Sequence, residues 1–314
     1  MVDFGLPLIS VVIVSDYLSD GAAESSDLAA TLGALACQDF DGSVEVLLVE
    51  SDEDQDACHR NFLAILPSLR LERSRGTGSY DMKNQGARTA RGQIIVLLDA
   101  DCRPAIDWLR NIARTLRDRP EVDVVSGRTL YAETGVVARV LALLSRSYVD
   151  RGISGATRHI SNNNAAFRRE TLLAHPLPTN AGPFASRVQA EAILRAGGCL
   201  FFEPSIRVIH RFDGWAMERD LRRNMGYGAI KVRHLDRTLP HAWIAHLGIL
   251  SVPLYSAART LASLRNTLLF GRHYGVRWFE LPLAWGLAVV VHLMEVPGMV
   301  AALRGREIER TAYR

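Results

Sequence analysis

Short apolar runs alternate with amphipathic segments along the first part of the chain. The runs at residues 8–14 (LISVVIV), 44–49 (VEVLLV) and 94–98 (IIVLL) are rich in β-branched residues and too short for isolated helices, so they predict buried strands. Between the first two runs, leucines recur at helical spacing over residues 28–36, and Asp27 can cap that helix. The order strand, helix, strand implies a right-handed parallel crossover. We therefore expect an α/β fold with a mostly parallel sheet and flanking helices.

The third apolar run ends on two carboxylates. Asp99 and Asp101 flank Ala100, and residues two apart in an extended chain project from the same face, so both can point at one hard cation. Such a cation would stand at the carboxyl end of a central strand, where open α/β sheets bind their ligands. The alternative is a pair of solvated acids without a metal, because a D-x-D motif alone has low specificity.

Polar residues also follow the two other predicted strands. Ser15, Asp16 and Tyr17 come directly after the first strand, and an acid-rich segment containing Glu50 and Asp52 follows the second. Because the carboxyl ends of parallel strands meet at one edge of a sheet, we expect these side chains beside the D-x-D pair. The alternative for the acidic segment is a solvated loop.

Lys83 is one of only two lysines in the chain. It lies in the first turn of a helix predicted over residues 80–91, where free backbone amides and the helix dipole favour an anion. A plain surface lysine is the alternative.

These segments, taken together, resemble a known family. The resemblance rests on the strand at 10–14 (SVVIV), the strand that runs into acids at 44–50, the segment 83–93 (KNQGARTARGQ) and the segment 97–104 (LLDADCRP). Further matches are found at residues 122–127, 162–169 and 201–210. In this order they are similar to family 2 glycosyltransferases, which have the GT-A fold, and the resemblance covers roughly residues 8–235.

The resemblance implies a site for a nucleotide-diphosphate sugar across the strand ends. Ser15, Asp16 and Tyr17 would hold the base and ribose, together with Glu50 and Asp52.

The resemblance also implies a metal, an acceptor side and phosphate contacts. Mn²⁺ or Mg²⁺ would bridge the diphosphate at Asp99 and Asp101, and it would stabilise the leaving group as a Lewis acid. His210 is a candidate third ligand or phosphate contact, with a structural role as the alternative. Further candidates are Lys83 and Arg88 for the diphosphate or sugar, and Asn163 and Asn164 for the acceptor side.

One departure from the family pattern concerns the catalytic base. Members carry a Glu-Asp pair that supplies the base, but Ala185 and Ser186 stand at the corresponding positions. Glu191 is the only acid on that predicted helix, and at 100° per residue it points about 140° away from the direction of Ser186. Either the helix begins differently and Glu191 serves, or Asp213 substitutes, or activity has been lost while nucleotide binding remains.

Two apolar stretches near the end of the chain, 242–257 and 281–303, favour a membrane-associated region. The second is long enough to span a bilayer, but it contains His292, Glu295 and Pro297. Arginines flank both stretches without the asymmetry typical of a spanning helix, so we expect a membrane-surface or re-entrant hairpin held against anionic lipid. A dimer interface or a helical cap is the alternative.

Composition narrows the function classes. The net charge of +3 includes no basic stripe typical of nucleic-acid binding, so we expect no nucleic-acid partner. The four cysteines lack C-x-x-C spacing, which argues against a zinc knuckle or disulfide framework and fits a reducing compartment. No signal-type segment opens the chain, so we expect a cytoplasmic protein, peripheral on the inner face of the cell membrane.

The sequence thus predicts a GT-A-type domain at residues 1–237 and a helical, membrane-associating region at 238–314. The predicted activity is metal-dependent, inverting transfer of a sugar from a nucleotide-diphosphate donor to a hydroxyl of a glycan or lipid-linked saccharide. The alternatives are a non-catalytic nucleotide-sugar-binding or scaffold protein and a nucleotidyltransferase. A nucleotidyltransferase would be favoured by a glycine-rich, basic loop after the first strand, and residues 15–19 do not form one.

Overall fold

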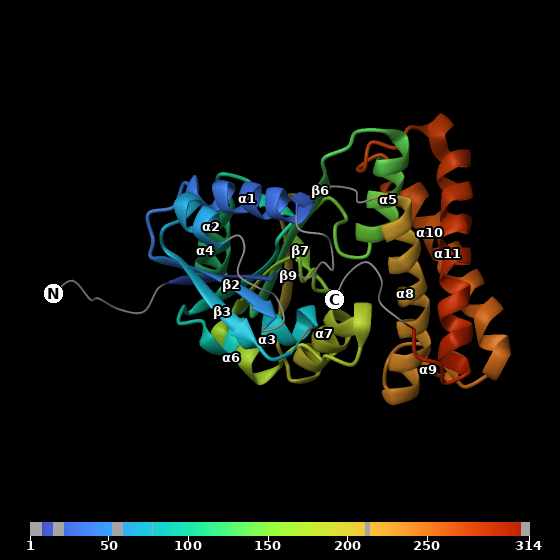
Figure 1. Ribbon diagram of the computed structural model, residues 1–314. Coiled ribbons are helices and arrows are strands. Elements are labelled where there is room, and N and C mark those ends of the chain that lie inside the picture. The colour runs from blue at the N-terminus through green and yellow to red at the C-terminus, as the bar shows by residue number, and fades with distance from the viewer. Residues whose placement is uncertain (1–7, 15–21, 52–58, 77, 211–213, 309–314) are drawn as a thin grey trace.

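The computed structural model describes residues 8–14, 22–51, 59–76, 78–210 and 214–308. Within these ranges, nine strands form one mixed sheet (Figure 1). The strands are β1 (Ile9–Val14), β2 (Val44–Ser51), β3 (Leu69–Ser74), β4 (Ile94–Asp99), β5 (Cys102–Pro104), β6 (Val124–Tyr131), β7 (Gly155–Ala156), β8 (Asn164–Arg168) and β9 (Leu200–His210). Their order is β3-β2-β1-β4-β8-β6-β9-β5, and β7 pairs with β9.

The strands predicted from the apolar runs are confirmed as β1, β2 and β4, which pair in parallel. Val14, the last residue of β1, lies opposite Val49 of β2 and Asp99 of β4. The ends of these strands therefore meet at one edge of the sheet. On the other side of β4 the sheet is no longer parallel, because β8 runs antiparallel to both β4 and β6.

Helices cover both faces of the sheet, and the alternation of side chains along β1 shows why its consecutive residues Val11–Val14 are all apolar. Ile9, Val11 and Ile13 pack against α1 (Ala22–Ala36), α2 (His59–Ile65) and α4 (Trp108–Asp118). Val12 and Val14 pack against α3 (Ser79–Thr89), α6 (Arg169–Ala174) and α7 (Ala185–Arg195) on the opposite face. Each such side chain contributes about 1.5–3 kcal/mol when fully buried. The predicted α/β fold is thus confirmed.

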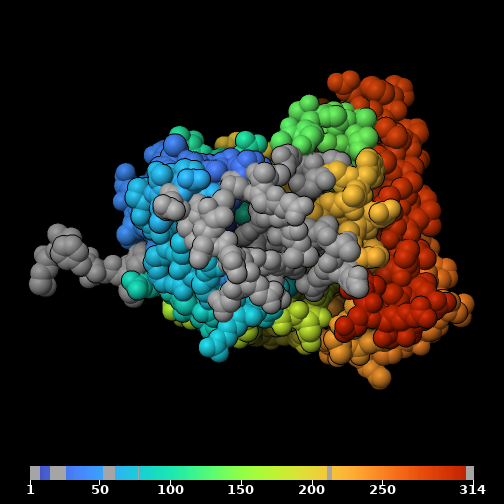
Figure 2. Space-filling view, in the orientation of Figure 1, coloured from blue at the N-terminus to red at the C-terminus, as the bar shows by residue number. Residues whose placement is uncertain are grey.

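Four helices stand beside the sheet domain as a separate layer (Figure 1): α5 (Val136–Arg146), α8 (Trp215–Leu235), α10 (Ser251–Phe270) and α11 (Leu281–Leu303). Figure 2 shows α5, α8 and α11 side by side along one flank of the molecule. The backbones of α8 and α11 approach closely, because a Cβ on Gly298 would lie 1.9 Å from the Arg223 carbonyl oxygen. The domain boundary predicted from the sequence, at residue 237, would place α8 and α11 in different domains. That boundary stays a prediction.

The predicted apolar stretch 242–257 is not one helix. A short helix, α9 (Ala242–Ala245), ends before Gly248, whose φ of 59° lies in the left-handed region, and α10 begins at Ser251. Among the described residues, one helical segment, Trp278–Leu303, is long and apolar enough to cross a membrane, and 33% of its most apolar window is buried.

Glu295, which the sequence analysis counted against a bilayer-spanning helix at 281–303, does not face outward. It is fully buried, and its carboxylate lies 2.7 Å from Arg259 Nε and 3.2 Å from His292 Nδ1. Burial opposes ionisation, but the charges of Arg259 and His292 leave the pKa of Glu295 below its ordinary value. The acid therefore joins α10 to α11 rather than standing unpaired in apolar surroundings.

Candidate active site

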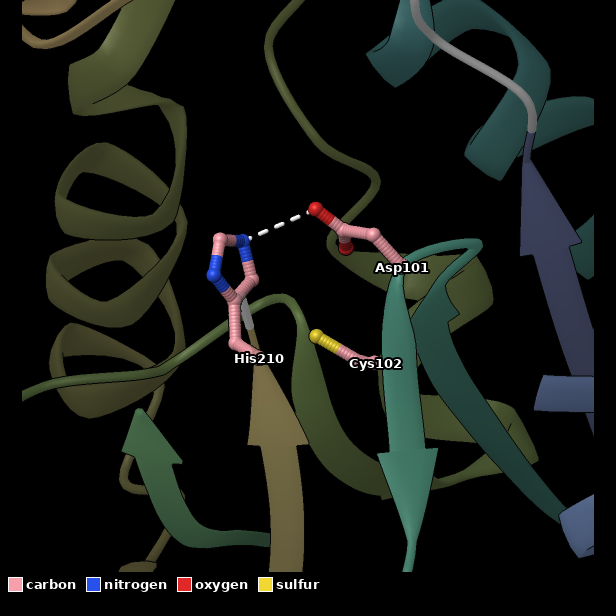
Figure 3. A group of neighbouring side chains, drawn as sticks. All are labelled: Asp101, Cys102 and His210. Atoms are coloured by element: carbon pink, nitrogen blue, oxygen red, sulfur yellow. Dashed lines mark ion pairs between the residues drawn. The ribbon is translucent and has the colours of Figure 1, made fainter. Parts of the chain in front are cut away.

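Sheet register brings Asp101 and His210 together. Asp99 ends β4, Asp101 lies in the turn before β5, and Cys102 of β5 lies opposite His210 at the end of β9. Asp101 Oδ2 is 2.9 Å from His210 Nε2 (Figure 3). The ring of Tyr131 packs edge-on against the imidazole, with 5.5 Å between the ring centroids.

The donor atoms at this point fit a divalent cation. Among the described residues, Asp101, Cys102 and His210 form the one group of potential ligands whose donor atoms all lie within 4.8 Å of one another. A carboxylate oxygen and an imidazole nitrogen suit Mn²⁺, and Mg²⁺ prefers the oxygen. Burial and then the carboxylates of Asp101 and Asp99 raise the pKa of the Cys102 thiol well above its ordinary value, so the sulfur is the weakest of the three donors.

Lys83 pairs with Asp99 rather than standing alone at a helix N-terminus. Its side chain is 3% exposed, and its Nζ lies 2.6 Å from Asp99 Oδ1. The same Nζ donates to the carbonyl oxygen of Asn162 at 3.4 Å. The two aspartates of the D-x-D motif thus have different basic partners, Lys83 for Asp99 and His210 for Asp101, and Asp99 lies outside the group of three potential ligands. Its role as a metal ligand stays a prediction.

Arg146, at the C-terminal end of α5, is a site residue that sequence reasoning missed. Its Nη1 donates to Asn163 Oδ1 at 3.3 Å and to Ser161 Oγ at 3.4 Å. Burial lowers the pKa of Arg146, but Tyr131, Tyr148, Cys102 and Asp99 outweigh it and raise that pKa above its ordinary value. No ion pair joins Arg146 to a carboxylate within the part of the chain that the structure describes. An arginine at the end of an apolar helix gives no sequence signal for this position.

The predicted acceptor-side asparagines are engaged in internal hydrogen bonds. Asn164 is fully buried, accepts from Trp108 Nε1 at 2.9 Å and donates to the Ile206 carbonyl at 3.1 Å. Asn163 accepts from Ser161 Oγ at 2.8 Å. Contact of either with an acceptor stays a prediction. By contrast, both amide atoms of the neighbouring Asn162 are buried without a hydrogen-bond partner among the described residues.

The helix that should carry the catalytic base begins as counted from the sequence. α7 starts at Ala185, after a 3-10 turn at Gly182–Phe184, so Ala185 and Ser186 occupy its first positions. Glu191 is buried one turn further along. Its carboxylate lies 2.7 Å from Arg187 Nη2 and 3.3 Å from Arg158 Nη2. Two guanidinium groups therefore hold the only acid of this helix.

Positive charge accumulates around Glu191. His159 Nδ1 accepts from Arg187 Nη1 at 3.0 Å, and its ring packs edge-on against Tyr148. Burial, followed by the charges of Arg187, Arg151 and Arg158, lowers the pKa of His159 to about 4. The imidazole is consequently neutral at pH 7, because protonation would add one more cation to the group.

The remaining predicted residues are only partly described. Glu50 lies at the end of β2, with its carboxylate 3.7 Å from Arg73 Nη1. Arg88 is exposed on α3 and donates to Gln85. The predicted residues Ser15, Asp16, Tyr17, Asp52 and Asp213 lie outside the described residues.

Comparison with known proteins agrees with this architecture. Residues 23–174 match the family model described as Glycosyl transferase family 2. The chain is 26% identical over 247 residues to glycosyltransferase AglE of Haloferax volcanii. This alignment covers 74% of this chain and 76% of AglE.

Two solved structures share the fold. The mannosyltransferase PcManGT from Pyrobaculum calidifontis, in complex with GDP-Man and Mn²⁺, aligns with a TM-score of 0.65 and 20% identity, over 97% of this chain and 89% of that one. TarS of S. aureus, residues 1–349, aligns with a TM-score of 0.52 and 13% identity, over 95% and 90% of the two chains. The resemblance to family 2 glycosyltransferases found from the sequence is thus confirmed over residues 23–174, and the chain shares the GT-A fold of these neighbours.

Proposed function

We propose that this protein transfers a sugar from a nucleotide-diphosphate donor to an acceptor at a membrane surface, with inversion at the anomeric carbon and with a divalent cation held by Asp101 and His210. The observation that carries the proposal is the 2.9 Å approach of Asp101 to His210 at the strand ends of a GT-A fold. A fold neighbour is described in complex with GDP-Man and Mn²⁺, which supports a nucleotide sugar and Mn²⁺ or Mg²⁺ here.

The residues around the strand ends suit this chemistry. A bound divalent cation would supply Lewis-acid stabilisation of the departing diphosphate. Lys83 fixes the Asp99 carboxylate at 2.6 Å and so holds it ready for the donor's ribose or phosphate. Glu50, at the end of β2, would contact the nucleoside with Ser15, Asp16, Tyr17 and Asp52. Inversion follows if the acceptor attacks once, from the face opposite the diphosphate.

The exposed flank of the helical layer supports the membrane location. Trp278 is 82% exposed, and Leu261, Ile249, Leu250 and Trp243 are each more than 60% exposed. Exposed arginines stand at both ends of α11, at Arg272 and Arg277 before it and at Arg304 and Arg306 after it. Apolar side chains bordered by arginines suit an anionic bilayer surface, on the cytoplasmic face of the cell membrane.

A non-catalytic, nucleotide-sugar-binding protein is the second candidate. It is favoured by Ala185 and Ser186 at the start of α7 and by the two arginines that hold Glu191. In that case the donor would bind without turnover.

Release of nucleoside diphosphate separates the two candidates. A panel of UDP-, GDP- and dTDP-sugars is incubated with membranes, with Mn²⁺ or with EDTA, for wild type and Asp101→Asn. We expect release that needs the metal and falls roughly 10³-fold in the variant, because a catalytic metal contributes several kcal/mol. Asp118→Asn, an exposed position on α4, is the matched control. Donor binding without release in any combination would favour the second candidate.

A further inference from the structure

The residues that stand where the family's catalytic base is expected limit which chemical group of the acceptor can attack the donor sugar. A sugar hydroxyl is neutral at pH 7 and needs a general base as it attacks. Among the described residues of this region, the first turn of α7 offers Ala185 and Ser186, and Glu191 already contacts two guanidinium groups; Asp213 lies outside the described residues. We propose that the acceptor's attacking group is a phosphate monoester on a lipid, which is already ionised; this inference rests on the proposed transferase function.

The residues beside the D-x-D motif fit such an anion. Arg146 makes no ion pair with a carboxylate in the described ranges, and it lies near Asp99 and Cys102. Through Ser161 it is linked to the segment that carries His159 and Arg158. Asn162, whose amide atoms are buried and without a partner in the described ranges, lies in the same segment.

Positive charge exceeds negative charge around the segment 158–163. The guanidinium groups of Arg158 and Arg187 share the carboxylate of Glu191. Arg146 makes no described ion pair, and the nearby Asp99 is itself paired with Lys83. His159, which lies among them, is held neutral. A dianionic phosphate would offset the excess positive charge and accept charge-assisted hydrogen bonds from Arg146.

The transfer step balances without a base. A phosphate oxygen attacks the anomeric carbon, the bond from that carbon to the diphosphate oxygen breaks, and the nucleoside diphosphate leaves with the electron pair. The second pKa of a phosphate monoester is about 6, so no proton has to be removed from the acceptor at pH 7. The product is a lipid-linked sugar phosphate diester.

α5 packs on the start of the helix whose exposed side chains we place at the membrane, which supports a phosphate that belongs to a lipid. Val140 and Leu143 of α5 pack against the buried side chains of Val276 and Ala284, and Trp278 between them in the chain is exposed. Just beyond Arg146, Ser147 accepts from Asn266 Nδ2 of α10 at 3.2 Å. A lipid whose chain lies along the flank would therefore present its head group near the end of α5.

The test compares acceptors on the wild-type protein with a donor that calorimetry shows to bind. Polyprenyl phosphate, polyprenol, glucose 1-phosphate and a short free oligosaccharide are offered in vesicles containing anionic lipid. We expect sugar transfer to polyprenyl phosphate at least ~10²-fold faster than to polyprenol or the oligosaccharide, because only the phosphate dispenses with a base. Faster transfer to the oligosaccharide or to polyprenol than to polyprenyl phosphate would overturn the proposal. Equal transfer to glucose 1-phosphate and to polyprenyl phosphate would overturn the claim that the phosphate belongs to a lipid.

Variants of Arg146 test the residue itself. Arg146→Gln should lower transfer to polyprenyl phosphate by ~10- to 100-fold, chiefly through KM for the acceptor, and Arg146→Lys should restore part of it. Arg117→Gln makes the same charge change on an exposed side chain of α4 and should leave transfer unchanged. Donor binding by calorimetry should survive in Arg146→Gln. Its loss in a folded variant would assign Arg146 to the donor and overturn its acceptor role. If wild type binds no donor, the transferase function itself fails, a result distinct from donor binding with the wrong acceptor.

Discussion

The two sides of the candidate site handle charge differently. On the proposed donor side, at the strand ends, each carboxylate of the D-x-D motif has a basic partner, Lys83 for Asp99 and His210 for Asp101. On the proposed acceptor side, around the C-terminal end of α5 and around α7, Arg158 and Arg187 share the carboxylate of Glu191, and Arg146 makes no described ion pair. This difference supports our proposals that the donor side takes up a cation with its diphosphate and that the acceptor side takes up an anion.

The largest effect on stability is expected from removing Lys83, the partner of Asp99 in their ion pair. Lys83→Gln should lower the free energy of unfolding by about 3 kcal/mol, the lower end for a buried ion pair because Asp99 keeps part of its exposure. Denaturant unfolding measures this loss. Lys231→Gln removes the only other lysine, which lies over the Tyr227 ring, and should cost no more than about 1 kcal/mol. Equal losses for the two lysines would contradict the buried pairing on the donor side.

On the acceptor side, His159 should make stability depend on pH. Its pKa falls from 6.5 to about 4 on folding, so its contribution is fully present above pH 6.5 and is lost as pH falls toward 4. The total loss is about 3 kcal/mol at most. Denaturant midpoints between pH 7 and 4 measure it, and His159→Gln should flatten the slope. An unchanged slope in the variant would show that the buried, positively charged surroundings do not lower the pKa of His159.

Packing of α11 on α8 should matter for stability but not for donor binding. Gly298→Ala places a Cβ against the Arg223 carbonyl and should cost about 1–3 kcal/mol of stability. Donor affinity should persist where the variant is folded, because the donor side is built on the sheet. Gly286→Ala, on the same helix with no atom within 4 Å of the new Cβ, should instead stabilise by up to about 1 kcal/mol. Destabilisation by both changes would argue against the close helix contact.

The smallest effect on turnover is expected from Glu191→Gln. If the acceptor is already ionised, transfer should change by less than about threefold, far below the ~10²–10⁴-fold that loss of a general base costs. Initial rates with polyprenyl phosphate and a bound donor provide the measurement. A fall of that larger size in a folded variant would make Glu191 the base and return the acceptor to a hydroxyl.

The donor side could be foreseen from the sequence because its signals are local. The apolar runs that become β1, β2 and β4 are buried on both faces, and Asp99 and Asp101 follow the last of them directly. His210 was placed by its family resemblance, and the pairing of Cys102 with His210 in the sheet explains its position.

The acceptor side could not be foreseen, because its properties arise from tertiary contacts. Arg146 is an ordinary residue at a helix end until Ser161 and Asn163 pack against it. Arg158, which helps to hold Glu191, comes from a different segment of the chain. Glu295 likewise looked costly within an apolar helix, since the arginines that neutralise it belong to α8 and α10.

Calorimetric titration with UDP-, GDP- and dTDP-sugars, each with and without Mn²⁺, tests the central claim most directly. Asp101→Ala is run beside wild type, and unfolding of both is followed to show that each is folded. We predict binding of one donor that needs the metal and is abolished in the variant. Absence of binding by every donor to folded wild type, or binding that persists unchanged in Asp101→Ala, would contradict a metal-dependent donor site at Asp101 and His210.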